Sequence, residues 1–280
     1  DVLGQVKEVH AWHGKFNFQP GGYWTKPASF PPPKHEIPEY LDWDLWLGPA
    51  ADRPFNSAYA PKSWRGFYDF GNGQLGDWSC HTLDAPFWAL DLGMPHIVEG
   101  AVPNPIADHS FVAEESVVTY KFKRRGNKAP VTLKWHEGGS KPKIRPEWGI
   151  KELGNSGMVM IGEKNTLMTG GRPNNPKLLV SDEAWNEFLK NAPEKTIPRV
   201  AEEKPVHEWI DAIKNNSLPG SNFNYAANLT EMALIGVMAQ RFATRIKYDA
   251  ENMKITNRSD LDRYVKEPTR NGWSYGEGLW

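Results

Sequence analysis

A two-residue hydrophobic period in the middle of the chain is the feature that most constrains the fold. Residues 116–124 alternate apolar and polar side chains, and 131–135 repeat the alternation after a turn-forming segment. Two such runs predict a β-hairpin. A second hairpin is expected from 158–161 and 166–169, and a further strand from 177–180. Strands with one apolar and one polar face are typical of an antiparallel sheet that is covered on one side.

The last hundred residues change to a helical period. Ser181 can cap a helix over 182–191, and Pro205 suits the first position of a second helix. Residues 228–244 are apolar on almost all sides, which predicts a buried helix, and a short final helix is expected from Ser259. Strands followed by helices indicate the α+β class. We therefore predict an open, mainly antiparallel sheet with helices packed on one face.

The first hundred residues are more irregular. Residues 6–12 predict one strand, and the prolines and glycines of 14–40 then predict a long loop. A short helix is expected over 40–47. Another is expected over 77–90, interrupted or restarted near Pro86.

Composition excludes several classes of protein. With 39% hydrophobic and 24% charged residues among 280, the chain is not expected to be disordered. A net charge of −1 gives no global electrostatic case for binding nucleic acid or an anionic membrane. No apolar run approaches the ~18 residues of a spanning helix. The single cysteine, Cys80, excludes an internal disulfide and a cysteine-based zinc site, while the cellular compartment stays open.

Gly71–Gly76 spells G-x-G-x-x-G, the fingerprint of a dinucleotide site, and Glu99 follows about 20 residues later. The context opposes that interpretation. Arg65 and Asp69 stand where a buried apolar strand should precede the glycines, and Asp77 would repel a pyrophosphate at the helix N-terminus. We therefore predict that these glycines shape a turn.

Asp77, His81 and Asp84 are spaced i, i+4, i+7, which on one helix would align the three side chains. A carboxylate beside an imidazole suits general acid–base catalysis. The spacing also permits a partial metal site, or a cap at Asp77 with a buried, hydrogen-bonded His81. His10 and His13 are expected to point to opposite faces of the first strand, which argues against joint metal ligation, and we predict no metal site.

Six runs of sequence, in order along nearly the whole chain, resemble the C-terminal region of the Gfo/Idh/MocA oxidoreductases, the glucose-fructose oxidoreductase and inositol dehydrogenase family. The resemblance is to the bacterial branch of that family that is rich in tryptophan. The runs are GQVKEVHAW (4–12), LDWDLWLGP (41–49), residues 64–88, VHEWIDAI (206–213), NFNYAANLTEMALIGVM (222–238) and YDAENMKITN (248–257).

The resemblance implies that residues 1–280 are one C-terminal α/β domain for substrate binding and oligomerisation. It further implies reversible hydride transfer between a sugar or polyol hydroxyl and NAD or NADP, with the nucleotide bound by a Rossmann domain that is absent from this chain. The chain alone is then expected to be inactive. A homo-oligomer through the open face of the sheet, with no nucleic acid or membrane partner, is also implied.

Asp77 and His81 match the family's Asp-x-x-x-His pair, in which the histidine accepts the hydroxyl proton. Trp64, Arg65 and Asp69 lie in the motif just upstream and are expected, with Asp84, to line the sugar site. The tripeptide 203–205 spells the family's Glu-Lys-Pro motif. It follows the Asp/His pair instead of preceding it, so its role is not carried over.

Two other functions remain open at this stage. The same site would suit a keto-sugar lyase, an epimerase or a glycosidase that recycles its nicotinamide. The domain could instead be a non-catalytic binding or assembly module, because exposed sheet faces often form interfaces.

Overall fold

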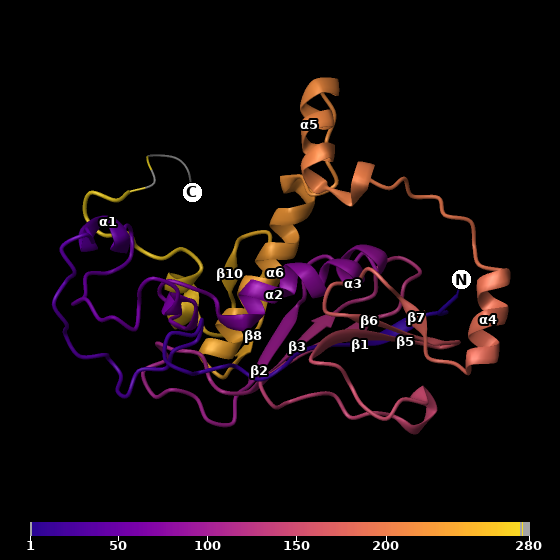
Figure 1. Cartoon of the computed structure of the whole chain (residues 1–280), viewed down its shortest axis with the longest axis horizontal. Helices are drawn as coiled ribbons and strands as arrows, with labels where there is room; N and C mark the ends of the chain where they lie inside the picture. The colour runs from indigo at the N-terminus through magenta and orange to yellow at the C-terminus, as the bar shows by residue number, and fades with distance from the viewer. Residues whose placement is uncertain (1, 275, 277–280) are drawn as a thin grey trace.

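The computed structural model describes residues 2–274 and 276. One sheet forms its centre (Figure 1). The strands are β1 (Val6–His13), β2 (Ile97–Ala101), β3 (Ser116–Phe122), β4 (Val131–Glu137), β5 (Ser156–Gly162), β6 (Thr166–Gly170), β7 (Lys177–Leu178) and β8 (Arg245–Ile246), with a separate pair β9 (Tyr248–Asp249) and β10 (Lys254–Ile255). The helices are α1 (Trp43–Leu47), α2 (Gly73–Thr82), α3 (Asp84–Ala89), α4 (Asp182–Lys190), α5 (Pro205–Asn215) and α6 (Phe223–Arg241). Short 3-10 helices are η1 (Ser63–Gly66), η2 (Pro146–Trp148), η3 (Ala201–Glu203) and η4 (Ser259–Tyr264).

The sheet has eight strands in the order β7-β6-β5-β1-β4-β3-β2-β8. Its neighbouring strands pair antiparallel except β1 and β4, which are parallel. Both predicted hairpins are present, as β3-β4 and β5-β6. The predicted α+β class with a mainly antiparallel sheet is confirmed.

One face of the sheet carries the main core. Val9 and Ala11 of β1 lie there with Val118 and Tyr120 of β3, and helices α2 and α6 pack against the same face. The other face is covered in part, because Trp12 forms a second small core with Trp148 of η2. Only part of the second face is therefore open, although the sequence pattern predicted a sheet covered on one side.

Capping side chains determine where two of the helices begin. The Ser181 hydroxyl accepts a hydrogen bond from the Ala184 amide at 3.2 Å and begins α4, as predicted. Helix α6 begins five residues earlier than expected, because the Asn222 side chain accepts from the Asn224 amide. Helix α2 likewise begins at Gly73, ahead of the predicted start.

The expected interruption of the helix over 77–90 falls at Leu83, between α2 and α3. Pro86 occupies the first turn of α3, where a missing backbone N–H is tolerated. The final predicted helix is the 3-10 helix η4. In the described residues no helix has the length and apolar character needed to cross a bilayer.

Helix α5 stands clear of the sheet (Figure 1). Its apolar residues follow the helical period, yet in this chain they are exposed. Val206 is 49%, Trp209 59% and Ile213 65% exposed. This apolar face has the character of an interaction surface rather than of a core.

A buried polar cluster lies where β4 meets α6. Glu137 is 1% exposed and accepts a hydrogen bond from Trp135 Nε1 at 2.9 Å and another from Gln240 Nε2. The same Gln240 amide donates to Ser116 Oγ at 2.6 Å. Burial disfavours the charged carboxylate and raises the pKa of Glu137 to about 7, against the lowering effect of these hydrogen bonds.

This buried carboxyl predicts a pH-dependent stability. Because the folded-state pKa of Glu137 exceeds its unfolded value, its contribution is fully present below about pH 4.5 and is lost as the pH rises through 7. The loss amounts to roughly 3 kcal/mol. We expect Glu137→Gln to reduce the difference in unfolding free energy between pH 5 and pH 8, measured by urea denaturation. An unchanged difference would show that Glu137 does not titrate in this range.

Candidate functional site

Helix α2 carries the two residues predicted to do the chemistry, and a tight glycine turn sets its start. Gly73 has φ +61°, which favours glycine. A Cβ atom at Gly71 would lie 2.7 Å from the Cα of Arg65, and one at Gly76 would lie 2.2 Å from the Cβ of Asn72. Close packing against the chain itself therefore accounts for these glycines.

The same turn does not fit a dinucleotide. The segment before Gly71 is a turn rather than a strand of the sheet, and the backbone of Arg65 fills the space beside that glycine. A pyrophosphate cradle needs that space open, at the end of a buried strand. The predicted rejection of the fingerprint is consistent with this geometry.

Asp77 and His81 lie one turn apart on α2, and both are exposed. Residues at i and i+4 lie on the same face of a helix, so the two side chains share one surface. The ring of His81 contacts the ring of Trp78, with centroids 5.5 Å apart. A substrate placed over this face would meet a carboxylate, an imidazole and an indole.

His13, at the end of β1, adds a second imidazole. Its ring centroid lies 4.3 Å from that of Trp78, and its Nδ1 shares a hydrogen bond with the Gln74 side chain. Burial lowers the pKa of His13, whereas the backbone of Gly14 and the charge of Asp77 act in the opposite direction. Sequence reasoning missed His13 as a site residue, although the two-residue strand period places it on the same face of β1 as the buried Val9 and Ala11.

Two further groups complete this surface. Gln74 is 2% exposed, and its Oε1 has no hydrogen-bond partner among the described residues. The guanidinium of Arg172 lies over the Trp78 ring, 5.3 Å from its centroid. We call Asp77, His81, His13, Gln74, Trp78 and Arg172 the α2 site. It offers donors and acceptors of the kind that bind hydroxyl groups.

Asp84 does not continue the helix of Asp77 and His81. The break at Leu83 puts it at the start of α3, so the predicted stripe on one continuous helix is wrong. Asp84 Oδ1 accepts a hydrogen bond from the Tyr225 hydroxyl at 2.6 Å. Burial and this carboxylate together raise the pKa of Tyr225. In this structure Asp84 thus joins α3 to α6.

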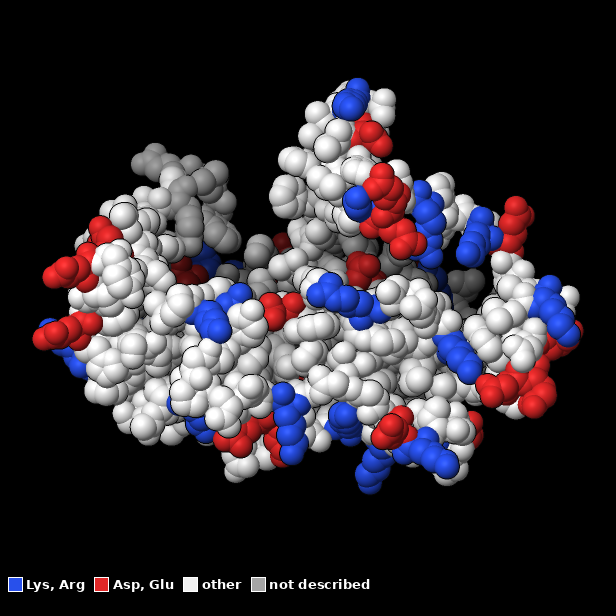
Figure 2. Space-filling view, viewed as in Figure 1, with Lys and Arg blue, Asp and Glu red and all other residues white. Residues whose placement is uncertain are grey.

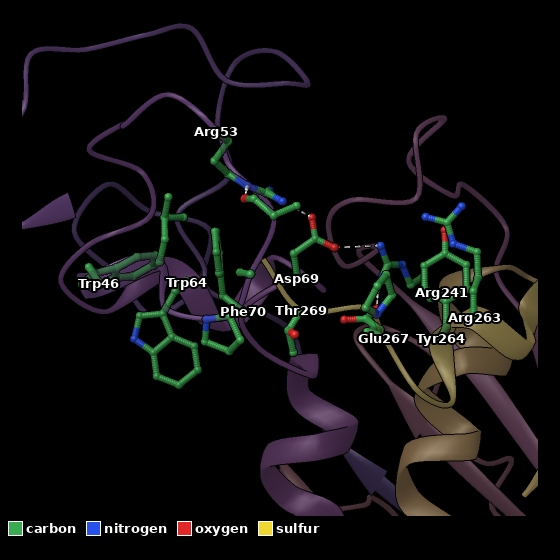
Figure 3. Close-up of a pocket in the computed structure, with 15 residues that line it drawn as sticks. Trp46, Arg53, Trp64, Asp69, Phe70, Arg241, Arg263, Tyr264, Glu267 and Thr269 are labelled. Carbon is green, nitrogen blue, oxygen red and sulfur yellow. Dashed lines mark hydrogen bonds and ion pairs between the residues drawn. The ribbon is translucent and has the colours of Figure 1, made fainter. Parts of the chain in front are cut away.

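Asp69 and Trp64 line a separate cavity of about 680 Å³ (Figure 3). Arg53 NH2 donates to Asp69 Oδ2 at 2.6 Å, and Arg241 NH2 donates to Asp69 Oδ1 at 3.0 Å. Burial alone would raise the pKa of Asp69, but the two guanidinium groups outweigh it, and the pKa is lowered. Asp69 is therefore a charged anchor in the cavity wall.

The predicted residues thus fall into separate places. Asp77 and His81 lie together in the α2 site, whereas Trp64 and Asp69 lie in the cavity, whose lining does not include Asp77, His81 or Asp84. Arg65 lies outside the lining as well, with its guanidinium 4.5 Å from the Trp64 ring and 4.8 Å from the Tyr23 ring.

His10 points away from the α2 site. Its Nδ1 hydrogen-bonds His136 Nε2 at 2.9 Å and its Nε2 hydrogen-bonds Glu8 Oε1 at 2.7 Å. His10 and His13 therefore have different partners, which agrees with the expectation that they point to opposite faces of the strand. Within residues 2–274 and 276, no group of three or more His, Cys, Asp or Glu side chains is arranged to hold a metal ion.

Residues 6–128 match a family model, GFO_IDH_MocA_C2, described as the C-terminal alpha/beta domain of an oxidoreductase family. The matched range includes β1, the cavity residues Trp64 and Asp69, and all of α2. No curated protein sequence matches the chain.

Three solved structures are similar over most of the chain. The aldose-aldose oxidoreductase from Caulobacter crescentus, complexed with glycerol, is 13% identical with a TM-score of 0.45, covering 88% of this chain and 56% of that one. A levoglucosan dehydrogenase in complex with NADH and levoglucosan is 12% identical with a TM-score of 0.46, covering 88% and 59%. The myo-inositol 2-dehydrogenase from Lactobacillus plantarum is 11% identical with a TM-score of 0.41, covering 88% and 58%. The chain therefore spans less than two thirds of the length of each.

Proposed function

We propose, from the match of residues 6–128 to the C-terminal alpha/beta domain of an oxidoreductase family, that this chain belongs to the Gfo/Idh/MocA oxidoreductases and is the substrate half of a sugar or polyol dehydrogenase. The reaction is reversible hydride transfer between a carbon-bound hydroxyl and NAD or NADP. The observation that carries this proposal is the exposed Asp77/His81 pair on α2, inside the matched range and beside His13.

His81 accepts the proton of the substrate hydroxyl in this proposal. An imidazole is suited to that task near neutral pH, and it becomes a cation when it takes the proton. The carboxylate of Asp77, one helical turn away, stabilises that cation. The exposed Arg172, whose guanidinium lies over the Trp78 ring, is available to position the other hydroxyl groups.

Nicotinamide, when bound, supplies the hydride acceptor. The described residues offer no cradle for its pyrophosphate at 71–76, so we assign nucleotide binding to a separate Rossmann domain. The exposed apolar face of α5, with Trp209 and Ile213, agrees with a chain that works against another domain. Alone, the 280-residue chain is then inactive.

The partners follow the same proposal. The substrate is a neutral sugar or polyol, and a homo-oligomer forms through the open part of the sheet face. The face in Figure 2 has Lys/Arg and Asp/Glu side chains interspersed, without one large field of a single sign. This face therefore offers no large positive field for phosphate groups.

The test is an assay of the full-length protein that contains this chain, with NAD or NADP and a panel of sugars and polyols. We expect substrate-dependent formation of reduced nicotinamide, measured by absorbance, and none from the isolated chain. Substrate conversion without net nicotinamide reduction would instead indicate the lyase, epimerase or glycosidase chemistry. The absence of any conversion across the panel would favour an assembly module.

A further inference from the structure

The cavity beside Asp69 is unused by the proposed reaction. It is lined by the loop after α1, by η1, by the end of α6 and by η4 with the segment after it (Figure 3). Its volume of about 680 Å³ lies within the range of sites for small molecules. Arg270 fixes one wall, because its guanidinium donates to the Gly48 carbonyl at 3.0 Å and to Asp52 Oδ1 at 3.0 Å.

The ion pairs around the cavity use two of the three guanidinium groups that line it. Asp69 is shared by Arg53 and Arg241, and Arg241 also lies 3.8 Å from Glu267. These two guanidinium groups and two carboxylates balance each other. Arg263 also lines the cavity, and among the described residues no carboxylate lies within salt-bridge distance of it. The Arg263 guanidinium, which lies 5.1 Å from the centroid of the Tyr264 ring, is therefore available to pair with an anion.

The remaining walls are aromatic. Trp46, Trp64, Phe70 and Tyr264 line the cavity, and none of them is fully buried. Indole and phenol rings pack against the apolar face of a sugar ring, while fixed carboxylates and guanidinium groups bind its hydroxyls. The aromatic rings, the two carboxylates and the guanidinium of Arg263, which has no ion-pair partner among the described residues, together fit a polyhydroxylated ligand that carries a carboxylate.

We propose that this cavity is a second binding site, specific for a sugar acid whose carboxylate pairs with Arg263. The sugar ring packs on the aromatic wall, and its hydroxyls donate to Asp69 and Glu267. Guanidinium and carboxylate form strong, charge-assisted hydrogen bonds, so the acid group distinguishes this ligand from a neutral sugar. The inference does not depend on His81, because His81 does not line the cavity.

The probe is D-galacturonate, titrated into the chain by calorimetry and by tryptophan fluorescence, with D-galactose and galactose 6-phosphate as comparisons. We expect saturable binding of the uronate and at least about tenfold weaker binding of galactose, because galactose lacks the carboxylate that forms a charge-assisted hydrogen bond with Arg263. Equal binding of galactose, or no binding of the uronate, overturns the proposal. Tighter binding of the phosphate ester overturns the assignment of a carboxylate.

Variants separate the cavity from the α2 site. Arg263→Met should weaken uronate binding about tenfold, whereas Arg124→Met, an exposed arginine outside the cavity, should leave it unchanged. His81→Asn should also leave it unchanged, so failure of the proposed dehydrogenase would not affect this test. Unchanged binding in Arg263→Met, at an unchanged thermal midpoint, contradicts the proposal. Loss of binding in His81→Asn places the uronate in the α2 site and contradicts it as well.

Discussion

Gly236→Ala abolishes the fold of this domain, in spite of the higher helix propensity of alanine. Gly236 lies in the middle of α6, where alanine alone would add about 1 kcal/mol of stability. A Cβ atom there would lie 1.6 Å from the Tyr120 hydroxyl and 2.5 Å from its Cζ. Tyr120 is fully buried in β3 and α6 packs directly on the sheet, so neither partner has room to move. The steric overlap with Tyr120 therefore outweighs the gain in helix propensity from alanine.

We expect a loss of more than about 4 kcal/mol, measured as a collapse of soluble yield and of the urea midpoint. Tyr120→Leu tests whether steric overlap causes the loss of stability, because it removes the atoms that meet the new methyl group. Adding Gly236→Ala to Tyr120→Leu should then cost far less than it does in the wild type. Gly154→Ala is the matched control, since a Cβ atom there meets nothing closer than 3.7 Å. A wild-type midpoint in Gly236→Ala would contradict the close packing of α6 on β3.

His81→Asn reduces the turnover number of the full-length protein by about 10² to 10⁴, the range of a lost general base. Asparagine keeps a polar side chain of similar size but cannot accept the proton. His81 is exposed on α2, so the substitution should leave the thermal midpoint unchanged. The Michaelis constant for the polyol should change little, because His81 contributes to the transition state more than to ground-state binding.

The matched control is His207→Asn on α5, which changes a histidine outside the α2 site. We expect wild-type kcat in this control. A His81→Asn protein with full turnover would remove His81 from the chemistry and leave the non-catalytic function as the better account.

Local patterns predicted most of the elements correctly. Residues 116–124 and 131–135 alternate because each strand has one buried and one partly exposed face, and this pattern needs only neighbouring residues to be seen. Ser181 and Pro205 likewise act within one turn of the helices that they begin. The break at Leu83 was placed only approximately, because Pro86 is equally compatible with the first turn of a new helix.

The sites depend on contacts that no local pattern carries. His13 meets Gln74 across 61 positions, and Arg241 meets Asp69 across 172. The upstream motif predicted Trp64 and Asp69 as residues of the reaction site, yet they line a cavity that does not include His81. Spacing reveals which residues can share a helix face. It does not reveal which segments the fold brings together.

Transfer of deuterium tests the central claim most directly. The substrate is a polyol that the full-length protein oxidises, labelled with deuterium at the carbon that bears the reacting hydroxyl. We expect hydride transfer to move the label from this carbon to the nicotinamide and to raise the mass of the reduced cofactor by one unit per substrate oxidised, at a rate that falls with His81→Asn. Conversion of the labelled substrate with the deuterium released to water, and none on the nicotinamide, would contradict it.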